Sequence, residues 1–288
     1  MNSIDSLKGL VCLVTGGARG IGFATASECA RRGAAIALLD QHADEARVAA
    51  ARIAERFGVS TTSASADVVD QKAVQVAIGE CRTRLGAIDI LVNCAGIMTP
   101  RLAPVSEMAV EDVEQMFSVH VRGAYICAQA VLPGMTERRF GRIMNISSVL
   151  GTLGLPFRSG YAIAKSAING FTRSLAVEVA RSGVTVNAVA PGYILTETLQ
   201  ARVDASLLDY ATYADRAPAG RWGLAEEVGH LIAFLALPAS GFITGTVIAV
   251  DGGYTIRGDP GEAIGPSASA SALESVRAIF ASPRRTPS

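Results

Sequence analysis

Tyr161 and Lys165 are one helical turn apart, and Ser148 lies shortly before them in the chain. A free phenol has a pKa of roughly 10, which is too high for a base at neutral pH. A lysine at i+4 shares a helix face with the tyrosine, so its ammonium can favour the phenolate. A serine hydroxyl can donate a hydrogen bond to a carbonyl oxygen where negative charge develops. The trio suits proton transfer at an alcohol or carbonyl. The Tyr-x-x-x-Lys spacing also arises by chance, so the chain must also supply a hydride carrier.

A glycine-rich turn after the first apolar run is the candidate carrier site. It runs from Thr15 to Gly22 and includes Gly16 and Gly20. Between a buried strand and a helix, such glycines permit a tight turn and let a pyrophosphate approach the N–H groups of the helix N-terminus. The spacing Gly-x-x-x-Gly-x-Gly departs from the common Gly-x-Gly-x-x-Gly fingerprint, although the strand and helix around it fit. A tight turn without a ligand is the alternative interpretation.

Acidic residues at two later strand ends bear on the choice of cofactor. Asp40 ends the second apolar run, where a carboxylate accepts hydrogen bonds from ribose hydroxyls and repels a 2′-phosphate. Arg19, in the glycine turn, is the contrary sign because it could reach such a phosphate. We therefore expect NAD rather than NADP. Asp67 could contact the adenine, or could simply be a polar residue that ends a strand.

Short apolar runs alternate with helical patterns over most of the chain, which predicts a parallel sheet covered on both faces. We expect an α/β fold with a single doubly wound (Rossmann) domain and a seven-stranded parallel sheet over residues 1–254. Residues 255–288 would be a C-terminal extension, partly disordered or docked on a neighbouring subunit, in which 272–281 could form a short helix. The expected strands are Leu10–Thr15, Ala35–Asp40, Thr61–Ala66, Ile88–Asn93, Gly141–Ser147, Val184–Val189 and Val247–Val250. The expected helices are Gly20–Arg32, Ala43–Phe57, Asp70–Leu85, Ser106–Met135, Ser159–Ala180 and Glu226–Leu237.

Composition excludes several classes of protein. Half of the 288 residues are hydrophobic and the formal net charge is zero, which argues against nucleic acid or an anionic membrane as the main partner. No apolar run is long enough for a membrane span, and the N-terminus lacks the pattern of a signal peptide. The five cysteines are odd in number and widely spaced, which is typical of reduced thiols in a cytoplasmic protein. Three histidines are too few and too scattered for a histidine-rich metal site, so we expect no metal.

With these observations together, the chain resembles a short-chain dehydrogenase/reductase from about Leu7 to Tyr254. The family's motifs occur here in order: Thr15–Gly22, Asp40, Asp67-Val68, Asn93-Cys94-Ala95-Gly96, Ser148, Tyr161 with Lys165, Pro191-Gly192 with Thr196, Arg221-Trp222-Gly223, and Asp251-Gly252-Gly253.

The resemblance implies roles for these residues. Tyr161 would be the general acid/base, Ser148 would orient the substrate oxygen, and Lys165 would lower the tyrosine pKa and bind the nicotinamide ribose. The cofactor would be held by Gly16, Arg19, Gly20, Ile21, Gly22, Asp40, Asp67, Val68, Asn93, Ala95, Gly96, Tyr161, Lys165, Pro191, Gly192, Ile194 and Thr196. Hydride would pass between the nicotinamide and the carbinol carbon of an alcohol or ketone.

His120 departs from the family, which usually has an asparagine there that holds a water in the proton relay. Histidine can donate and accept, and it titrates near pH 6.5 when unperturbed. His120 could therefore serve the relay and add a pH dependence, or it could only fill a polar niche on a buried helix bend. Cys94, where a second asparagine is common, is interpreted as a packing change. His42 and His230 are expected to have no role.

The segment 197–219 follows the nicotinamide loop, lacks a clear helix or strand pattern, and is expected to cover the substrate. Gly151–Arg158 would form the opposite wall, with Leu153, Leu155 and Phe157 as mostly apolar contributors. These apolar residues favour a fairly apolar secondary alcohol or ketone, without excluding a sugar. Two alternatives remain: a 3-oxoacyl-carrier-protein reductase, which normally prefers NADP, and a non-catalytic nucleotide-binding protein. The family usually forms dimers or tetramers, so a homo-tetramer or homo-dimer is expected.

Overall fold

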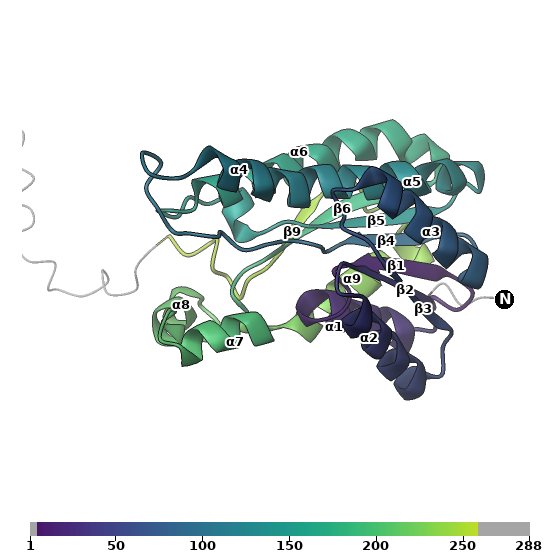
Figure 1. The fold of residues 1–288 in the computed structure, drawn as a ribbon, viewed down its shortest axis with the longest axis horizontal. Coiled ribbons are helices and arrows are strands. Elements are labelled where there is room, and N and C mark those ends of the chain that lie inside the picture. The colour runs from purple at the N-terminus through teal and green to yellow at the C-terminus, as the bar shows by residue number, and fades with distance from the viewer. Residues whose placement is uncertain (1–4, 259–288) are drawn as a thin grey trace, which may run out of the picture. The chain divides into compact units, whose positions relative to one another are not determined.

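A seven-stranded parallel sheet lies at the centre of the computed structural model, which describes residues 5–258 (Figure 1). The strand order is β3-β2-β1-β4-β5-β6-β9, and every neighbouring pair is parallel. The expected doubly wound α/β fold is therefore confirmed. The strands are β1 (Val11–Thr15), β2 (Ala35–Asp40), β3 (Thr61–Ser65), β4 (Ile90–Asn93), β5 (Gly141–Ile146), β6 (Val184–Pro191) and β9 (Val247–Val250).

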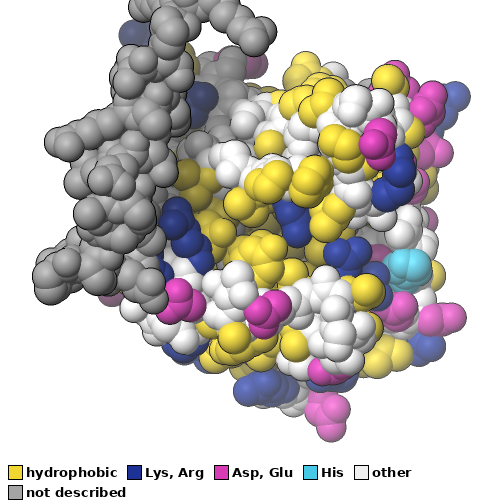
Figure 2. Space-filling view, turned by 90° about the vertical axis from the view of Figure 1, so that its left-hand side faces the viewer, with side chains coloured by type: hydrophobic (Ala, Val, Ile, Leu, Met, Phe, Trp, Pro, Cys, Tyr) yellow, Lys and Arg dark blue, Asp and Glu magenta, His cyan; other side chains and the backbone are white. Residues whose placement is uncertain are grey.

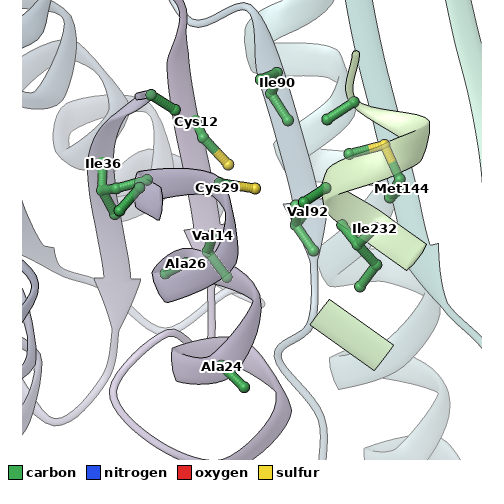
Figure 3. Packing of buried hydrophobic residues seen from close by; sticks show 14 of the residues in the cluster. Cys12, Val14, Ala24, Ala26, Cys29, Ile36, Ile90, Val92, Met144 and Ile232 are labelled. Atoms are coloured by element: carbon green, nitrogen blue, oxygen red, sulfur yellow. The ribbon is translucent and has the colours of Figure 1, made fainter. Parts of the chain in front are cut away.

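Alternate residues of each strand face opposite helix layers, so both faces of the sheet are buried. On β1, Cys12 and Val14 join one apolar cluster, whereas Val11 and Leu13 join the other. Figure 3 shows the first cluster from close by, with Cys12 beside Cys29 of α1. The helices on that face are α1 (Gly20–Arg31), α2 (Ala43–Phe57) and α9 (Ala225–Leu235). The helices on the opposite face are α3 (Gln71–Leu85), α4 (Val110–Phe117), α5 (Gly123–Glu137) and α6 (Ser159–Val179).

The chain order reverses between β1 and β4, whose carboxyl ends lie side by side. In open α/β sheets a ligand binds outside the carboxyl ends of the strands at this switch point. The glycine turn follows β1, the segment from Cys94 follows β4, and Ser148 follows β5 closely. The topology thus gathers the candidate residues at one edge of the sheet.

Two expectations about helices were wrong. The helix predicted from Ser106 begins at Val110, because Glu107 and Met108 donate their N–H groups to Pro104 in a separate turn. It is also interrupted by a π turn, Ser118–Arg122, before α5 continues to Glu137. The ends of the other expected elements differ by at most two residues.

The segment 197–219, expected to lack helices, contains α7 (Glu197–Asp204) and α8 (Tyr210–Arg216). Both begin at a side-chain cap: Thr196 Oγ1 accepts from Leu199 N at 3.4 Å, and Asp209 Oδ1 accepts from Ala211 N at 3.0 Å. Both are short and largely exposed, so they carry no apolar periodicity that would reveal them. The two-residue strands β7 (Ile194–Leu195) and β8 (Gly223–Leu224) pair on either side of this segment.

Residues up to Thr255 form one compact unit. The possible helix over 272–281 lies outside the described residues. No helix between residues 5 and 258 combines the length and apolar character that crossing a bilayer requires. All five cysteines are free thiols.

Candidate active site

Ser148 and Tyr161 meet at the carboxyl edge of the sheet. Ser148 follows β5 and caps a 3-10 turn by accepting from Leu150 N at 3.2 Å, while Tyr161 lies in the first turn of α6. The two side chains line the same cavity, and Ser148 acts to lower the pKa of Tyr161. The loop that carries Ser148 is fastened to α6, because Ser147 donates to Asn169 Oδ1 at 2.6 Å and Asn169 donates to Gly151 O at 3.2 Å.

The charge state of Tyr161 is set mainly by burial. Burial raises its pKa to about 12, although Ser148 and the charge of Arg158 act in the lowering direction. Without a bound ligand, the phenol is therefore protonated at neutral pH. It is a proton donor in this state.

Lys165 approaches the ring of Tyr161 rather than its hydroxyl. Its Nζ donates to Ile146 O at 2.8 Å and lies 5.4 Å from the centroid of the tyrosine ring. Burial lowers the pKa of Lys165 to about 8. The lysine ammonium is thus held by a main-chain carbonyl at the end of β5.

His120 lies in the π turn and is buried against Tyr161. The two rings are edge to face with centroids 5.4 Å apart, and His120 Nε2 is 2.9 Å from Ile97 O. This distance fits a neutral ring that donates from Nε2, which leaves Nδ1 as an acceptor without a partner among the described residues. Burial, followed by the charge of Lys165, lowers the pKa of His120 to about 3. The ring is thus uncharged across the range in which the sequence suggested titration.

Gly96 is required by the His120 ring. A Cβ at Gly96 would lie 2.5 Å from His120 Cε1 and 2.9 Å from Nδ1. The Asn93–Gly96 segment is fastened to the glycine turn, because Thr15 Oγ1 accepts from the N–H groups of Cys94 and Ala95, both at 3.1 Å.

The glycine turn has the close-packed backbone expected of a phosphate cradle. Gly16 and Gly20 have φ of 63° and 54°, and a Cβ at Gly22 would lie 2.1 Å from Gly16 O. Asp40 lies beside this turn, where its carboxylate accepts from Ala18 N at 3.2 Å and from His42 N at 3.1 Å. Exposed N–H groups and a ribose-facing carboxylate fit a nicotinamide dinucleotide.

Other expected cofactor residues occupy distinct positions. Arg19 is exposed and its guanidinium is 3.9 Å from Glu45 of α2. Asp67 is exposed and accepts from Val69 N at 3.1 Å, whereas Val68 is buried where a Cβ at Gly123 would contact it. 

Asn93 points into the protein, since its Nδ2 donates to Asn145 Oδ1 at 2.8 Å and to Ala124 O at 3.4 Å. The structure therefore shows this side chain joining β4 to β5 and α5. Ile21 packs against the core in the first turn of α1.

The nicotinamide loop brings the end of β6 to the glycine turn. Pro191 ends β6, Gly192 N donates to Val250 O at 3.0 Å, and Ile194 is buried in the core. Thr196 faces the glycine turn, since a Cβ at Gly20 would lie 3.6 Å from Thr196 Cγ2.

A cavity of about 110 Å³ opens where Ser148 and Tyr161 meet. Figure 2 faces this edge of the sheet, where hydrophobic side chains gather in the middle of the surface with Lys or Arg side chains among them. The cavity is lined by Met98, Thr99, Ser148, Val149, Leu150, Leu155, Arg158, Tyr161, Gly192, Tyr193, Leu199, Arg202 and Leu208.

The lining corrects several expectations. Leu155, Leu199 and Leu208 line the cavity, but Leu153 and Phe157 do not. Two tyrosines of the segment 197–219 do not line the cavity but pack against other aromatic rings: Tyr213 stacks on Tyr193 with centroids 4.1 Å apart, and the Tyr210 ring lies 5.0 Å from that of Trp222.

Met98, Thr99, Tyr193 and Arg202 of the lining were not expected from the sequence, whereas Arg158 lies at the end of the expected wall Gly151–Arg158. The sequence signal for Arg158 is its place in this segment, three residues before Tyr161, and Arg202 carries no such signal. Between residues 5 and 258, no group of three His, Cys, Asp or Glu side chains could hold a metal ion.

Comparisons with known proteins find relatives that match most of the chain. Residues 16–255 match the family model described as Enoyl-(Acyl carrier protein) reductase. The chain is 40% identical to cis-4-hydroxycyclohexanecarboxylate dehydrogenase of Sinomonas cyclohexanicum over 247 residues, which are 85% of this chain and 96% of that protein. It is 37% identical to the 3-oxoacyl-acyl-carrier-protein reductase of Aquifex aeolicus (strain VF5) over 247 residues, 86% of this chain and 98% of that protein.

A solved structure is similar along nearly its whole length. It is a gluconate 5-dehydrogenase from Burkholderia cenocepacia J2315 in complex with NADP and tartrate, with a TM-score of 0.82 and 38% identity, covering 88% of this chain and 97% of that one. The chain belongs to the short-chain dehydrogenase/reductase family and is an NAD(P)-dependent oxidoreductase.

Proposed function

We propose that this protein interconverts a secondary alcohol and a ketone, with Tyr161 as the acid and base that exchanges the proton of the substrate oxygen. The observation that carries the proposal is that Tyr161 and Ser148 line the same cavity, where Ser148 acts to lower the pKa of the Tyr161 phenol. Two hydroxyl groups that converge there can both reach one substrate oxygen. Hydride transfer is the chemistry that a nicotinamide cofactor supplies when bound.

The protonated state of Tyr161 fits reduction at neutral pH. As the carbonyl carbon gains a hydride, the phenol would give its proton to the carbonyl oxygen while Ser148 donates a hydrogen bond to the same oxygen. The oxidation runs in reverse: the alcohol loses its proton to the phenolate and its hydride from carbon. Because a pKa of about 12 leaves little phenolate at neutral pH, oxidation should accelerate as pH rises.

Lys165 and His120 would position the reacting groups. Lys165 carries a positive charge at neutral pH over the tyrosine ring and would hold a ribose hydroxyl of the cofactor. His120 is neutral and wedged between Ile97 and Tyr161, so in this proposal it fixes the tyrosine ring or takes part in the proton relay without a change of charge.

NAD is the proposed cofactor. The carboxylate of Asp40 is held beside the glycine turn by two main-chain N–H groups, where it would accept from ribose hydroxyls and repel a 2′-phosphate. Arg19, the side chain that would favour a phosphate, is close to Glu45. Replacing Asp40 with serine should lower the ratio of kcat/KM for NAD to kcat/KM for NADP. An unchanged ratio would remove the basis for this preference.

The test of the reaction is a spectrophotometric assay of reduced nicotinamide with a panel of ketones and alcohols. By their names, the relatives act on a hydroxycyclohexanecarboxylate, on gluconate and on 3-oxoacyl carrier protein, so the panel includes these types. Tyr161→Phe keeps the ring beside His120 and removes only the hydroxyl, and we expect turnover to fall by roughly 10²–10⁴-fold.

Tyr193→Phe is the matched control, because it also removes a phenol from the cavity wall but one that is stacked on Tyr213. Cofactor binding, followed by nicotinamide fluorescence, should be retained in both variants. Equal turnover by Tyr161→Phe and wild type, or no turnover on any substrate, would defeat the proposal.

A further inference from the structure

Two arginines stand out in a cavity wall that otherwise consists of apolar side chains, hydroxyl groups and a glycine. Arg158 precedes α6 and Arg202 lies on α7, so the two guanidinium groups come from opposite walls. No aspartate or glutamate lines this cavity. A guanidinium carries five N–H donors and stays charged at any working pH, so the site offers an excess of donors and positive charge.

Neither guanidinium makes an ion pair or a hydrogen bond with the part of the chain between residues 5 and 258. Two other arginines of the fold do have protein acceptors. Arg142 donates to main-chain carbonyls that include Leu237 O at 3.2 Å, and Arg138 lies 3.1 Å from Asp89. Arg158 and Arg202 are both only partly exposed, and their side chains line the cavity without an acceptor among the described residues.

The positive charge reaches the reacting groups. Arg158 acts to lower the pKa of Tyr161, of Tyr193 and of Tyr254, all of which border or back this cavity. A negatively charged ligand would therefore supply the counter-charge that the lining of the cavity does not give to the two arginines. Such complementarity also draws an anionic ligand toward the site.

We infer that the substrate is a hydroxy acid or oxo acid whose carboxylate is bound by Arg158 and Arg202. This inference rests on the proposed function, since Tyr161 and Ser148 mark where the reacting oxygen lies. Guanidinium groups bind carboxylates through two parallel hydrogen bonds, which fixes orientation as well as affinity. Leu155, Leu199 and Leu208 would contact the carbon skeleton between the two polar ends.

The two arginines would also determine which carbon of the substrate reacts and which face of the carbonyl group receives the hydride. A substrate held at one end by its carboxylate can present only the carbon at a fixed distance from it to Tyr161. A neutral ketone of the same shape would lack this anchor, and its binding would leave both guanidinium groups desolvated without an acceptor. The acid should therefore be preferred in kcat/KM by roughly 10- to 100-fold.

Matched ligands test the inference in two ways. In turnover, 4-oxocyclohexanecarboxylate is compared with its carboxamide, which has nearly the same shape but no charge. In binding, calorimetry compares cyclohexanecarboxylate with cyclohexanecarboxamide in the presence of cofactor, and needs no chemistry. Both are measured for the wild type, for Arg158→Gln, Arg202→Gln and Arg202→Lys, and for Arg47→Gln, an exposed arginine on α2 that serves as the control.

The preference for the acid should be lost in both glutamine variants, partly retained in Arg202→Lys, and unchanged in Arg47→Gln. Equal binding of acid and amide by the wild type, or a preference that survives both glutamine variants, would overturn the inference. Tighter binding of cyclohexyl phosphate than of the carboxylate would also overturn it, in favour of a phosphate ester. A charge preference in calorimetry without any turnover would instead count against the proposed reaction, so the two failures are distinguishable.

Discussion

Replacing His120 with asparagine is expected to make the protein less sensitive to acid. In the folded chain the pKa of His120 is lowered to about 3, whereas an exposed histidine titrates near 6.5. Between these two values the unfolded chain binds a proton that the folded chain does not, so acid favours unfolding. The stability from the neutral ring is fully present above about pH 6.5 and is lost as pH falls toward 3.

The size of the effect follows from the two pKa values. Linkage gives a loss of about 2.5 kcal/mol in the free energy of unfolding between about pH 7 and about pH 4.5. Because the side chain is 5% exposed, little of this is screened by solvent. Asparagine does not titrate, so the variant should lack this part of the acid sensitivity even if its stability at neutral pH is lower.

Urea unfolding at the two pH values measures the difference, with the fluorescence of the single tryptophan, Trp222, as the signal. Protein concentration is held constant, because association would shift the apparent stability. His42→Asn is the matched control, since His42 is exposed and should alter acid sensitivity little. An equal loss of stability by wild type and His120→Asn would refute the view that the ring is buried and neutral.

The same reasoning applies to kinetics. A ring that titrates only near pH 3 cannot set the acidic limb of a pH–rate profile near pH 6, so His120→Asn should leave that limb in place. A shift of the acidic limb in His120→Asn would instead support the hypothesis from the sequence that this histidine adds a pH dependence to the proton relay.

Further outcomes follow from the glycines and from Tyr161. Gly96→Ala should lower the free energy of unfolding by about 1–3 kcal/mol in urea, because the new Cβ would lie 2.5 Å from His120 Cε1. If Gly96→Ala were equally destabilising in a protein that also carries His120→Asn, the clash would not be with the histidine ring. Gly22→Ala should abolish cofactor binding measured by fluorescence titration, while Gly79→Ala in α3, where a Cβ meets nothing within 4 Å, should not; binding by Gly22→Ala would contradict the cradle. Without cofactor, the difference in ultraviolet absorbance between wild type and Tyr161→Phe should show no phenolate below about pH 11, and a signal near pH 8 would refute the raised pKa of this tyrosine.

Much of the architecture could be predicted because its causes are local and repeated. Each buried strand reads as an apolar run, and each helix as a periodic pattern, so the sheet and the residues at its carboxyl edge follow from the sequence alone. The meeting of Ser148 with Tyr161 belongs to this group. Both positions are set by where β5 ends and where α6 begins.

The properties that the sequence could not reveal depend on neighbours far along the chain. The i+4 spacing places Lys165 on the same helix face as Tyr161, but Ile146 O, a main-chain acceptor on β5, determines where the ammonium lies. Likewise, the neutrality of His120 comes from burial against Ile97 and Tyr161. The pairing of Arg158 with Arg202 was missed for the same reason, since the sequence does not show that the two side chains line one cavity.

The π turn at Ser118–Arg122 has a consequence for the two helices that it joins. A π turn holds one residue more than an α-helical turn, and one residue corresponds to a rotation of about 100° around the helix axis. The helix is continuous from α4 to α5, but its packing face is rotated at the π turn. The apolar side chains of α4 can therefore contact α6 while those of α5 contact the sheet. Removing a single residue from the turn would align the packing faces of α4 and α5 along one side of the helix. The helix could then keep the contacts of α4 with α6 or the contacts of α5 with the sheet, but not both.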